Sequence, residues 1–448
     1  MENEIQLTVQ PELAPTRELH TVIAPGKCSW GECTYCGWGR VESKVDVERM
    51  KAAVLALNLN GVRRLKVFTS GSFLDDAQYP PEFRNWFADY VFKKKNLPEF
   101  VLESRPEYLT KEALAPFPPE RTLIAIGLES SDDEVLARIQ KGFTFETYKR
   151  AAQLCRSLGY RMRTFLMVNA PGQTQEVLGK SVEDVLPLSD EIVLINTYPH
   201  SNTPLARDWL EGNWQPMNKK EFWQAVAKWK DAPGVECDDS NFAFVPKFPA
   251  EVRAEVKEKL LTGAKPDNLE NNYYRVWQDY FCRFYEPPAG KDICLLLPCS
   301  YRKPYERSET HKKIYGALYG LPASRRVHRV VVSNPGVIPI EYSDGWPFHA
   351  YDWPEQEETP ELMQMYVEVT KKRVNQYALA HKGEYKRFFA YFKHTETWEA
   401  VRQAFEELGV PITNLLDDQT WEKVKGLPNA VTQPQALEAL KKGLAEII

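Results

Sequence analysis

The sequence predicts an α/β protein in which a parallel sheet, either curled towards a barrel or open and doubly wound, is followed by a second, smaller α/β unit. From about residue 20 to residue 198, short β-branched or apolar segments alternate with longer amphipathic ones. Apolar strands separated by helix-length crossovers form parallel sheets covered by helices. The chain of 448 residues also exceeds the size of one ordinary domain.

In the first half, each strand is expected where an apolar run follows a helical pattern. The expected strands are 20–24, 65–70, 100–104, 123–129, 163–168 and 191–198. Helical periodicity is found in 47–57, 145–158 and 177–188, and Ser131 with Glu134 has the spacing of a capping box. Chemistry in such folds lies at the carboxyl ends of the strands.

The second unit is expected to begin after Pro287, Pro288, Ala289 and Gly290, which have the composition of a linker. We therefore predict one domain over 1–287, closed by an aromatic helical segment, and another over 288–448. In the second domain, apolar runs predict strands at 292–298, 328–334 and 386–392, and helical patterns cover 361–380 and 395–408.

The composition is that of a globular protein outside the membrane. The chain is 43% hydrophobic and carries a net charge of -5, and it contains no apolar run of membrane-spanning length. The first residues lack the pattern of a signal peptide, so we expect a cytoplasmic location with reduced cysteines. The acidic balance argues against coating of nucleic acid by the whole surface but leaves local RNA contacts open.

A cysteine-rich segment follows the first expected strand. Cys28, Cys33 and Cys36 lie within nine residues. A closed structural zinc site needs four ligands, and no second CxxC or paired histidines complete one. Three thiolates on a four-iron, four-sulfur cluster would leave one iron open. We therefore expect a reactive cluster whose fourth ligand is a cofactor or substrate.

The C-x4-C-x2-C spacing, with Tyr35 before the last cysteine and a β/α repeat behind it, resembles the radical SAM superfamily. The resemblance implies a partial parallel (β/α) barrel, a [4Fe-4S] cluster held by the three cysteines, and S-adenosyl-L-methionine (SAM). The segments TSGSFLD, ESRPE, GLESSDDEVL and NAPGQT occupy the places of cofactor-lining loops. The implied cofactor-binding residues are Tyr35, Ser70, Gly71, Ser72, Glu103, Arg105, Glu129 and Asn169, and Asp75 is implied to contact substrate. In the alternative interpretation Glu129 is a helix-capping carboxylate and 169–174 a plain turn.

A polar loop follows the first expected strand of the second unit. It gathers hydroxyl and cationic groups that suit a carboxylate or phosphate, and the residues are Ser300, Lys303, Tyr305, Ser308 and His311. A domain-docking loop explains the same composition, and Cys299 is either a nucleophile or a small strand-end residue. The pattern PCSxRKPYxxSxxH resembles the core domain of archaeosine synthase (ArcS), and the first half resembles its radical SAM partner (RaSEA-like).

Together these resemblances imply a radical SAM lyase of archaeosine-type 7-deazaguanine modification, which cleaves a lysine adduct of a 7-cyano-7-deazaguanine base to the amidine. The implied partners are a 7-deazaguanine base or tRNA substrate, its lysine adduct and an electron-donor protein, with no membrane and no defined oligomer. Two alternatives remain open. One is another radical SAM tRNA-modifying enzyme of the methylthiotransferase type, and the other is a non-catalytic iron-sulfur RNA-binding accessory protein.

Overall fold

The chain divides into two compact units, Met1–Phe242 and Ala243–Ile448. The computed structural model describes residues 18–23, 26–41, 44–68, 71–200, 202–240, 245–248, 253, 256–257 and 259–446. Within these ranges, none of the helices is both long and apolar enough to cross a membrane. Each unit has its own sheet and its own buried apolar core.

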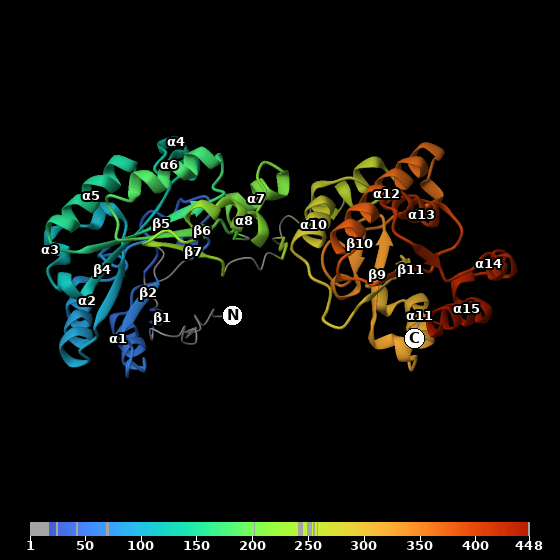
Figure 1. Cartoon of the computed structure of the whole chain (residues 1–448), viewed down its shortest axis with the longest axis horizontal. Coiled ribbons are helices and arrows are strands. Elements are labelled where there is room, and N and C mark those ends of the chain that lie inside the picture. Colours follow the sequence, from blue (N-terminus) through green and yellow to red (C-terminus); the bar gives the residue numbers. More distant parts are fainter. Residues whose placement is uncertain are drawn as a thin grey trace. The chain divides into compact units, whose positions relative to one another are not determined.

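Unit 1 is built on a seven-stranded sheet in which every neighbouring pair of strands is parallel. The strands lie side by side in chain order, and the sheet curls into a half-barrel (Figure 1). They are β1 (Glu18–Val22), β2 (Arg64–Phe68), β3 (Glu99–Glu103), β4 (Thr122–Glu129), β5 (Arg161–Val168), β6 (Glu191–Asn196) and β7 (Val235–Asp238). The predicted partial barrel is confirmed.

Helices cover the outer face of this sheet (Figure 1). They are α1 (Val47–Leu55), α2 (Pro81–Ala88), α3 (Lys111–Leu114), α4 (Asp133–Arg138), α5 (Phe145–Ser157), α6 (Gln175–Val185), α7 (Pro204–Glu211) and α8 (Lys219–Ala225). Alternate strand residues such as Phe100, Leu102 and Ile124 pack against the helices in the main core. Their neighbours in the sequence, Val101 and Leu123, face the opposite side of the sheet and belong to a small separate cluster, as the two-residue period of a strand requires.

Charged residues join the strands of unit 1 near their amino ends. Arg64 on β2 donates hydrogen bonds to Glu18 on β1 and to Glu191 on β6, at 3.2 and 3.0 Å, and it also pairs with Glu99 on β3. Arg163 on β5 adds a 2.8 Å bond to Glu191. These ion pairs link the strands at the end of the sheet opposite to the cysteines. The carboxyl ends of the strands are not joined by these pairs and are available for a functional site.

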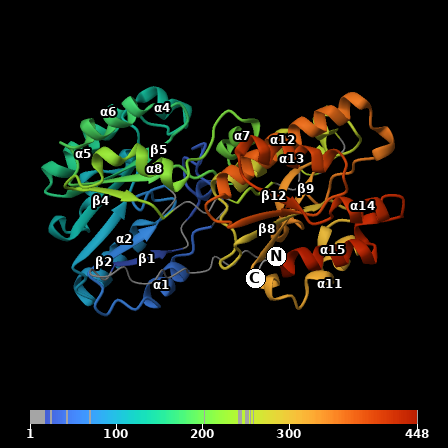
Figure 2. The same cartoon turned by 45° about the vertical axis from the view of Figure 1, so that its right-hand side comes forward.

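Unit 2 has a smaller, mixed five-stranded sheet of order β10-β9-β8-β11-β12, in which only β10 against β9 is antiparallel. Figure 2 shows α12 and α13 on one side of it and α11 and α15 on the other. The strands are β8 (Ile293–Pro298), β9 (Val327–Ser333), β10 (Gly336–Pro339), β11 (Arg387–Ala390) and β12 (Ile412–Asn414). The helices are α10 (Asn272–Arg283), α11 (Glu309–Leu318), α12 (Pro360–His381), α13 (Glu396–Leu408), α14 (Asp418–Val424) and α15 (Pro434–Ala445).

The structure adds to the sequence expectations at several places. Strands β7, β10 and β12, each of three or four residues, were not foreseen. The aromatic helix α10, expected to close the first half, lies in unit 2, where it packs against α12 and β10. The capping-box expectation was wrong: Asp132 caps α4, while the Ser131 hydroxyl donates to Asp184 at 2.7 Å.

Candidate active site

The segment 26–40, here called the cysteine loop, lies at the carboxyl end of β1, and its backbone is held by neighbouring loops. The Thr34 amide donates to the Ile139 carbonyl and the Leu205 amide donates to the Thr34 carbonyl, both at 3.0 Å. Cys28, Cys33 and Cys36 carry free thiols. Because contacts from two distant segments fix the backbone between them, the loop presents these thiols in a defined arrangement.

The surroundings of these thiols fit an iron-sulfur cluster. The Gly39 amide donates to Cys36 Sγ at 3.3 Å, a type of hydrogen bond that tunes cluster potentials. Burial raises the pKa of the Cys36 thiol, but metal coordination holds a thiol deprotonated. Among the described residues, no three His, Cys, Asp or Glu side chains converge on a single ion. In a cubane cluster each thiolate binds a different iron, so convergence on one point is not required.

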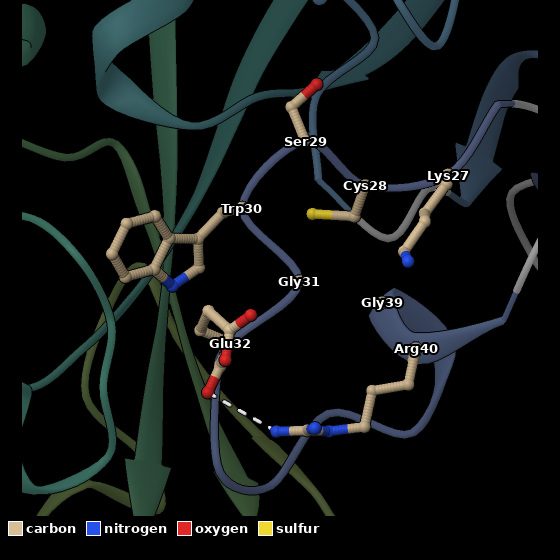
Figure 3. A pocket seen from close by; sticks show the side chains of 8 residues that line it. All are labelled: Lys27, Cys28, Ser29, Trp30, Gly31, Glu32, Gly39 and Arg40. Carbon is tan, nitrogen blue, oxygen red and sulfur yellow. Dashed lines mark hydrogen bonds between the residues drawn. The ribbon is translucent and has the colours of Figure 1, made fainter.

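Space for a bound group opens beside Cys28. A pocket of about 540 Å³ is lined by Lys27, Cys28, Ser29, Trp30, Gly31, Glu32, Gly39 and Arg40. Figure 3 shows the Cys28 thiol within the arc of this loop, with Gly39 and Arg40 on the returning segment. A Cβ on Gly71 would lie 2.9 Å from Cys28 Sγ, so glycine at 71 keeps the thiol clear.

The segment after β2 is fastened to the cysteine loop. Gly71 adopts φ +127°, which a residue with a side chain rarely does. Gln78 accepts from the Ser72 amide at 2.9 Å and donates to the Gly26 carbonyl at 3.1 Å. Ser29 of the cysteine loop donates to Asp75 at 2.5 Å. The expected Gly71, Ser72 and Asp75 therefore lie beside Cys28, while Ser70 falls outside the described residues.

Tyr35, Glu129 and Lys141 form a buried group next to the cysteines. The Tyr35 hydroxyl donates to Glu129 Oε1, and Lys141 Nζ donates to both the Tyr35 oxygen and Glu129 Oε1, each at 2.9 Å. Burial and then the Glu129 carboxylate hold the pKa of Tyr35 well above its usual value. Burial lowers the pKa of Lys141, but the Glu129 carboxylate and the nearby Cys33 sulfur together raise it above its usual value. Tyr35 is thus a neutral phenol beside a charged pair.

Glu129 has an unusual backbone conformation for a residue with a side chain. Its φ is +76° at the end of β4, where the pairing with β5 shifts register. Such strain persists only where the surroundings enforce it, and it is frequent at functional sites. The helix-capping alternative does not describe Glu129, because its carboxylate binds Tyr35 and Lys141.

Glu103 is the last residue of β3 and Arg105 follows the strand, and the two have different partners. The Arg105 guanidinium lies between the rings of Trp30 and Phe143, at 5.4 and 5.1 Å from their centroids. It also donates to the Lys141 carbonyl at 3.0 Å. Glu103 pairs with Lys66 on the inner face of the sheet at 3.1 Å. Arg105 thus fastens the cysteine loop, whereas Glu103 lies inside the half-barrel.

Asn169 ends β5 in a left-handed conformation, with φ +70°. Its side chain donates to the Gln215 carbonyl at 2.8 Å, and its backbone amide donates to Gln173 at 2.9 Å. The Trp214 indole donates to the Asn169 carbonyl at 2.9 Å. The segment 169–174 is therefore a fixed strand-end loop with defined contacts.

The sequence expectations missed the segment between α4 and α5. Trp30 donates to the Gln140 carbonyl at 2.8 Å, and the Lys141 side chain reaches Tyr35. A Cβ on Gly142, at φ +82°, would lie 2.4 Å from the Trp30 ring. The available signal was a lysine and a glycine directly after a short helix, which is too common to single out.

In unit 2, the residues expected at a substrate site lie around the carboxyl end of β8. Tyr305 is buried and donates to Ser333 at 3.0 Å. Ser308 caps α11 by accepting from the His311 amide at 3.1 Å, and Ser300 donates to the Arg302 carbonyl at 3.0 Å. The half-buried Lys303 ammonium lies 3.8 Å from the ring centroid of Tyr351, a residue not foreseen.

His311 is buried under this loop. Its Nε2 lies 2.9 Å from the Pro298 carbonyl, and its Nδ1 has no hydrogen-bond partner among the described residues. Burial lowers the pKa of His311 to about 4, and it also lowers the pKa of Lys303. The loop thus combines a neutral imidazole with an ammonium whose charge is destabilised by its surroundings.

The other cysteines do not form a second group. Cys155 lies on α5, Cys237 on β7, Cys282 on α10 and Cys294 on β8, while Cys299 follows β8 and is exposed. All are unpaired thiols, and no three metal-ligating side chains of the described residues gather around any of them.

Comparison with known families assigns a class to each unit. Residues 22–185 match the radical SAM superfamily, and residues 275–443 match a domain of unknown function, DUF5591. The chain therefore carries a radical SAM domain followed by a DUF5591 domain. This agrees with the half-barrel and the cysteine loop of unit 1 and with the separate sheet of unit 2.

Three of the individual relatives are archaeal proteins. The chain is 27% identical over 219 residues to archaeosine synthase subunit beta of Methanosarcina acetivorans, covering 45% of this chain and 63% of that protein. It is 30% identical over 171 residues to the subunit of the same name from Thermococcus kodakarensis, covering 36% and 52%. It is also 40% identical over 137 residues to archaeosine synthase subunit alpha of Thermoplasma acidophilum, covering 29% and 24%. The chain thus spans less than two thirds of each relative.

Proposed function

We propose that this chain is a radical SAM lyase of archaeosine-type nucleoside modification, acting on a lysine adduct of a 7-cyano-7-deazaguanine base. The observation that carries the proposal is that one chain matches two different families. A radical SAM domain stands beside a DUF5591 domain, and the chain is similar to relatives named as both subunits of archaeosine synthase.

The cysteine loop is the proposed cofactor site. Cys28, Cys33 and Cys36 would hold a [4Fe-4S] cluster, and SAM would lie beside it near Gly71 and Tyr35. When reduced, the cluster with SAM supplies a 5'-deoxyadenosyl radical that can remove a hydrogen atom from an unactivated carbon. The protein's part is to orient one C–H bond and to exclude water and other hydrogen donors.

Within this proposal one hydrogen atom is transferred from the lysine side chain to the 5'-deoxyadenosyl radical, and the bond between the lysine carbon and the amidine nitrogen then breaks. The lysine carbons leave as an alkene, and one electron and one proton complete the amidine base. Unit 2 would hold the lysine adduct or form it. Lys303 suits an anionic carboxylate or phosphate, because its ammonium is half-buried and oriented by the Tyr351 ring. An electron-donor protein would supply the reducing equivalent.

The test is an anaerobic assay of reconstituted protein with RNA carrying the lysine adduct, reading 5'-deoxyadenosine and the mass of the base. We expect conversion of adduct to amidine by the parent, and neither product from Cys36→Ala. The Lys303→Ala variant should cleave SAM normally but convert less adduct. A methylthiolated product would favour the methylthiotransferase alternative. A protein that binds iron but never cleaves SAM would be an accessory protein, and the proposal would fail.

A further inference from the structure

The segment 139–143 between α4 and α5, here called the brace segment, contacts the cysteine loop at successive positions. Its Ile139 carbonyl accepts from the Thr34 amide at 3.0 Å, and its Gln140 carbonyl accepts from the Trp30 indole at 2.8 Å. Lys141 then reaches Tyr35, directly before Cys36. The cysteine loop is therefore held from outside its own sequence.

Lys141 and Glu129 together fix the direction of the Tyr35 hydroxyl and hold it from both sides. An ammonium group can only donate, and a carboxylate can only accept. Since Lys141 donates to the Tyr35 oxygen, the single phenolic proton of Tyr35 points to Glu129 Oε1, with both bonds 2.9 Å long. Lys141 donates to the same Oε1 at 2.9 Å, so both ends of the group are fixed.

Because the group of Tyr35, Glu129 and Lys141 is buried, its geometry depends on all three side chains. The side chains of Lys141 and Glu129 are each 9% exposed, so water cannot replace a missing partner. No hydrogen bond from a described residue reaches Glu129 Oε2, which is the free acceptor of the group. Without Lys141, the buried carboxylate would lose its counter-charge, and only the single hydrogen bond from Tyr35 to Glu129 would hold the two side chains in place.

We propose that Lys141 is a positioning residue, which sets the orientation of Tyr35 and Glu129 beside the cysteine loop and thereby the geometry of the group bound there. The inference rests on the proposed function in that the bound group is SAM. Lys141 itself acts through Tyr35 and Glu129, since its ammonium is occupied by these two residues.

Two variants separate the parts of this inference. Lys141→Met removes the ammonium at similar length, whereas Tyr35→Phe keeps the Lys141–Glu129 pair and removes only the link to the cysteine loop. Lys141→Arg restores a cation. The control is Lys149→Met on α5, which breaks an exposed pair with Glu146.

The first readout needs no cofactor. Amide hydrogen exchange of residues 28–40 in the unloaded full chain should be faster in Lys141→Met and Tyr35→Phe and unchanged in the Lys149 control. In reconstituted protein, the KM for SAM should rise about tenfold in both variants with iron content preserved, and Lys141→Arg should recover most of it. If both variants keep the parent's exchange and KM, Lys141 has no positioning role. If the two variants exchange faster as expected but the parent never cleaves SAM, the proposed function alone is refuted.

Discussion

Replacing Gly142 by alanine tests whether the brace segment holds the cysteine loop. Gly142 has φ +82°, and an added Cβ would lie 2.4 Å from the Trp30 ring. Gly159 provides a matched control, because its φ is +86° and the nearest atom to an added Cβ, on Pro119, lies at an ordinary 3.7 Å. Both substitutions carry the same backbone cost of about 1–2 kcal/mol, so their difference isolates the contact with Trp30.

The difference can be worked from the contacts that Trp30 would lose on moving away. Its hydrogen bond to Gln140 contributes about 0.5–1.5 kcal/mol, and the Arg105 guanidinium over its ring about 0.5–1 kcal/mol at a partly exposed site. We therefore expect Gly142→Ala to destabilise the closed loop by about 1–2.5 kcal/mol more than Gly159→Ala, a factor of about 5–60 in its opening equilibrium.

Hydrogen exchange measures this local opening directly. Amides of residues 28–40 should exchange about 5–60 times faster in Gly142→Ala than in Gly159→Ala, with no difference in the peptides of unit 2. Equal exchange of the two variants in residues 28–40 would refute the reasoning, because the clash with Trp30 would then have no effect on the cysteine loop.

Three further predictions concern the cluster, a buried histidine and the domain boundary. Alanine at Cys28, Cys33 or Cys36 should abolish iron binding measured after reconstitution, whereas alanine at the buried Cys155 of α5 should retain it. A full cluster in Cys36→Ala would contradict the assignment. Because burial lowers the pKa of His311 to about 4, the unfolded state binds its proton first as the pH falls below about 6.5. The free energy of unfolding of unit 2, measured with urea, should therefore fall by up to about 3 kcal/mol between pH 6.5 and 4. His311→Gln should reduce this pH dependence, and an equal pH dependence in the parent and the variant would contradict the prediction. Finally, the fragment 243–448 should show a cooperative melt by circular dichroism and the fragment 288–448 should not, since the shorter one lacks buried Trp277 and Phe281 of α10; equal melting temperatures would show that α10 is dispensable.

Strand-forming segments of unit 1 were predictable because buried parallel strands read as continuous apolar runs, as in β4, where Gly127 is the only residue that is not fully buried. Short strands such as β12, with three residues, carry too little pattern to be distinguished from loops. The capping expectation at Ser131 failed because the adjacent Asp132 competes for the same helix end, and a sequence pattern does not rank two neighbouring caps.

The sequence by itself determined the cysteine loop and its place at a strand end, because the ligand spacing is local and the β/α order dictates which end of the sheet follows each strand. Only the tertiary structure decided what surrounds it. Tyr35, Glu129 and Lys141 are separated by up to 106 residues along the chain and meet because the loops after β1 and β4 converge at one end of the half-barrel. The placement of α10 in unit 2 is equally non-local, since an amphipathic aromatic helix fits any apolar surface and its sequence does not specify which one it will cover.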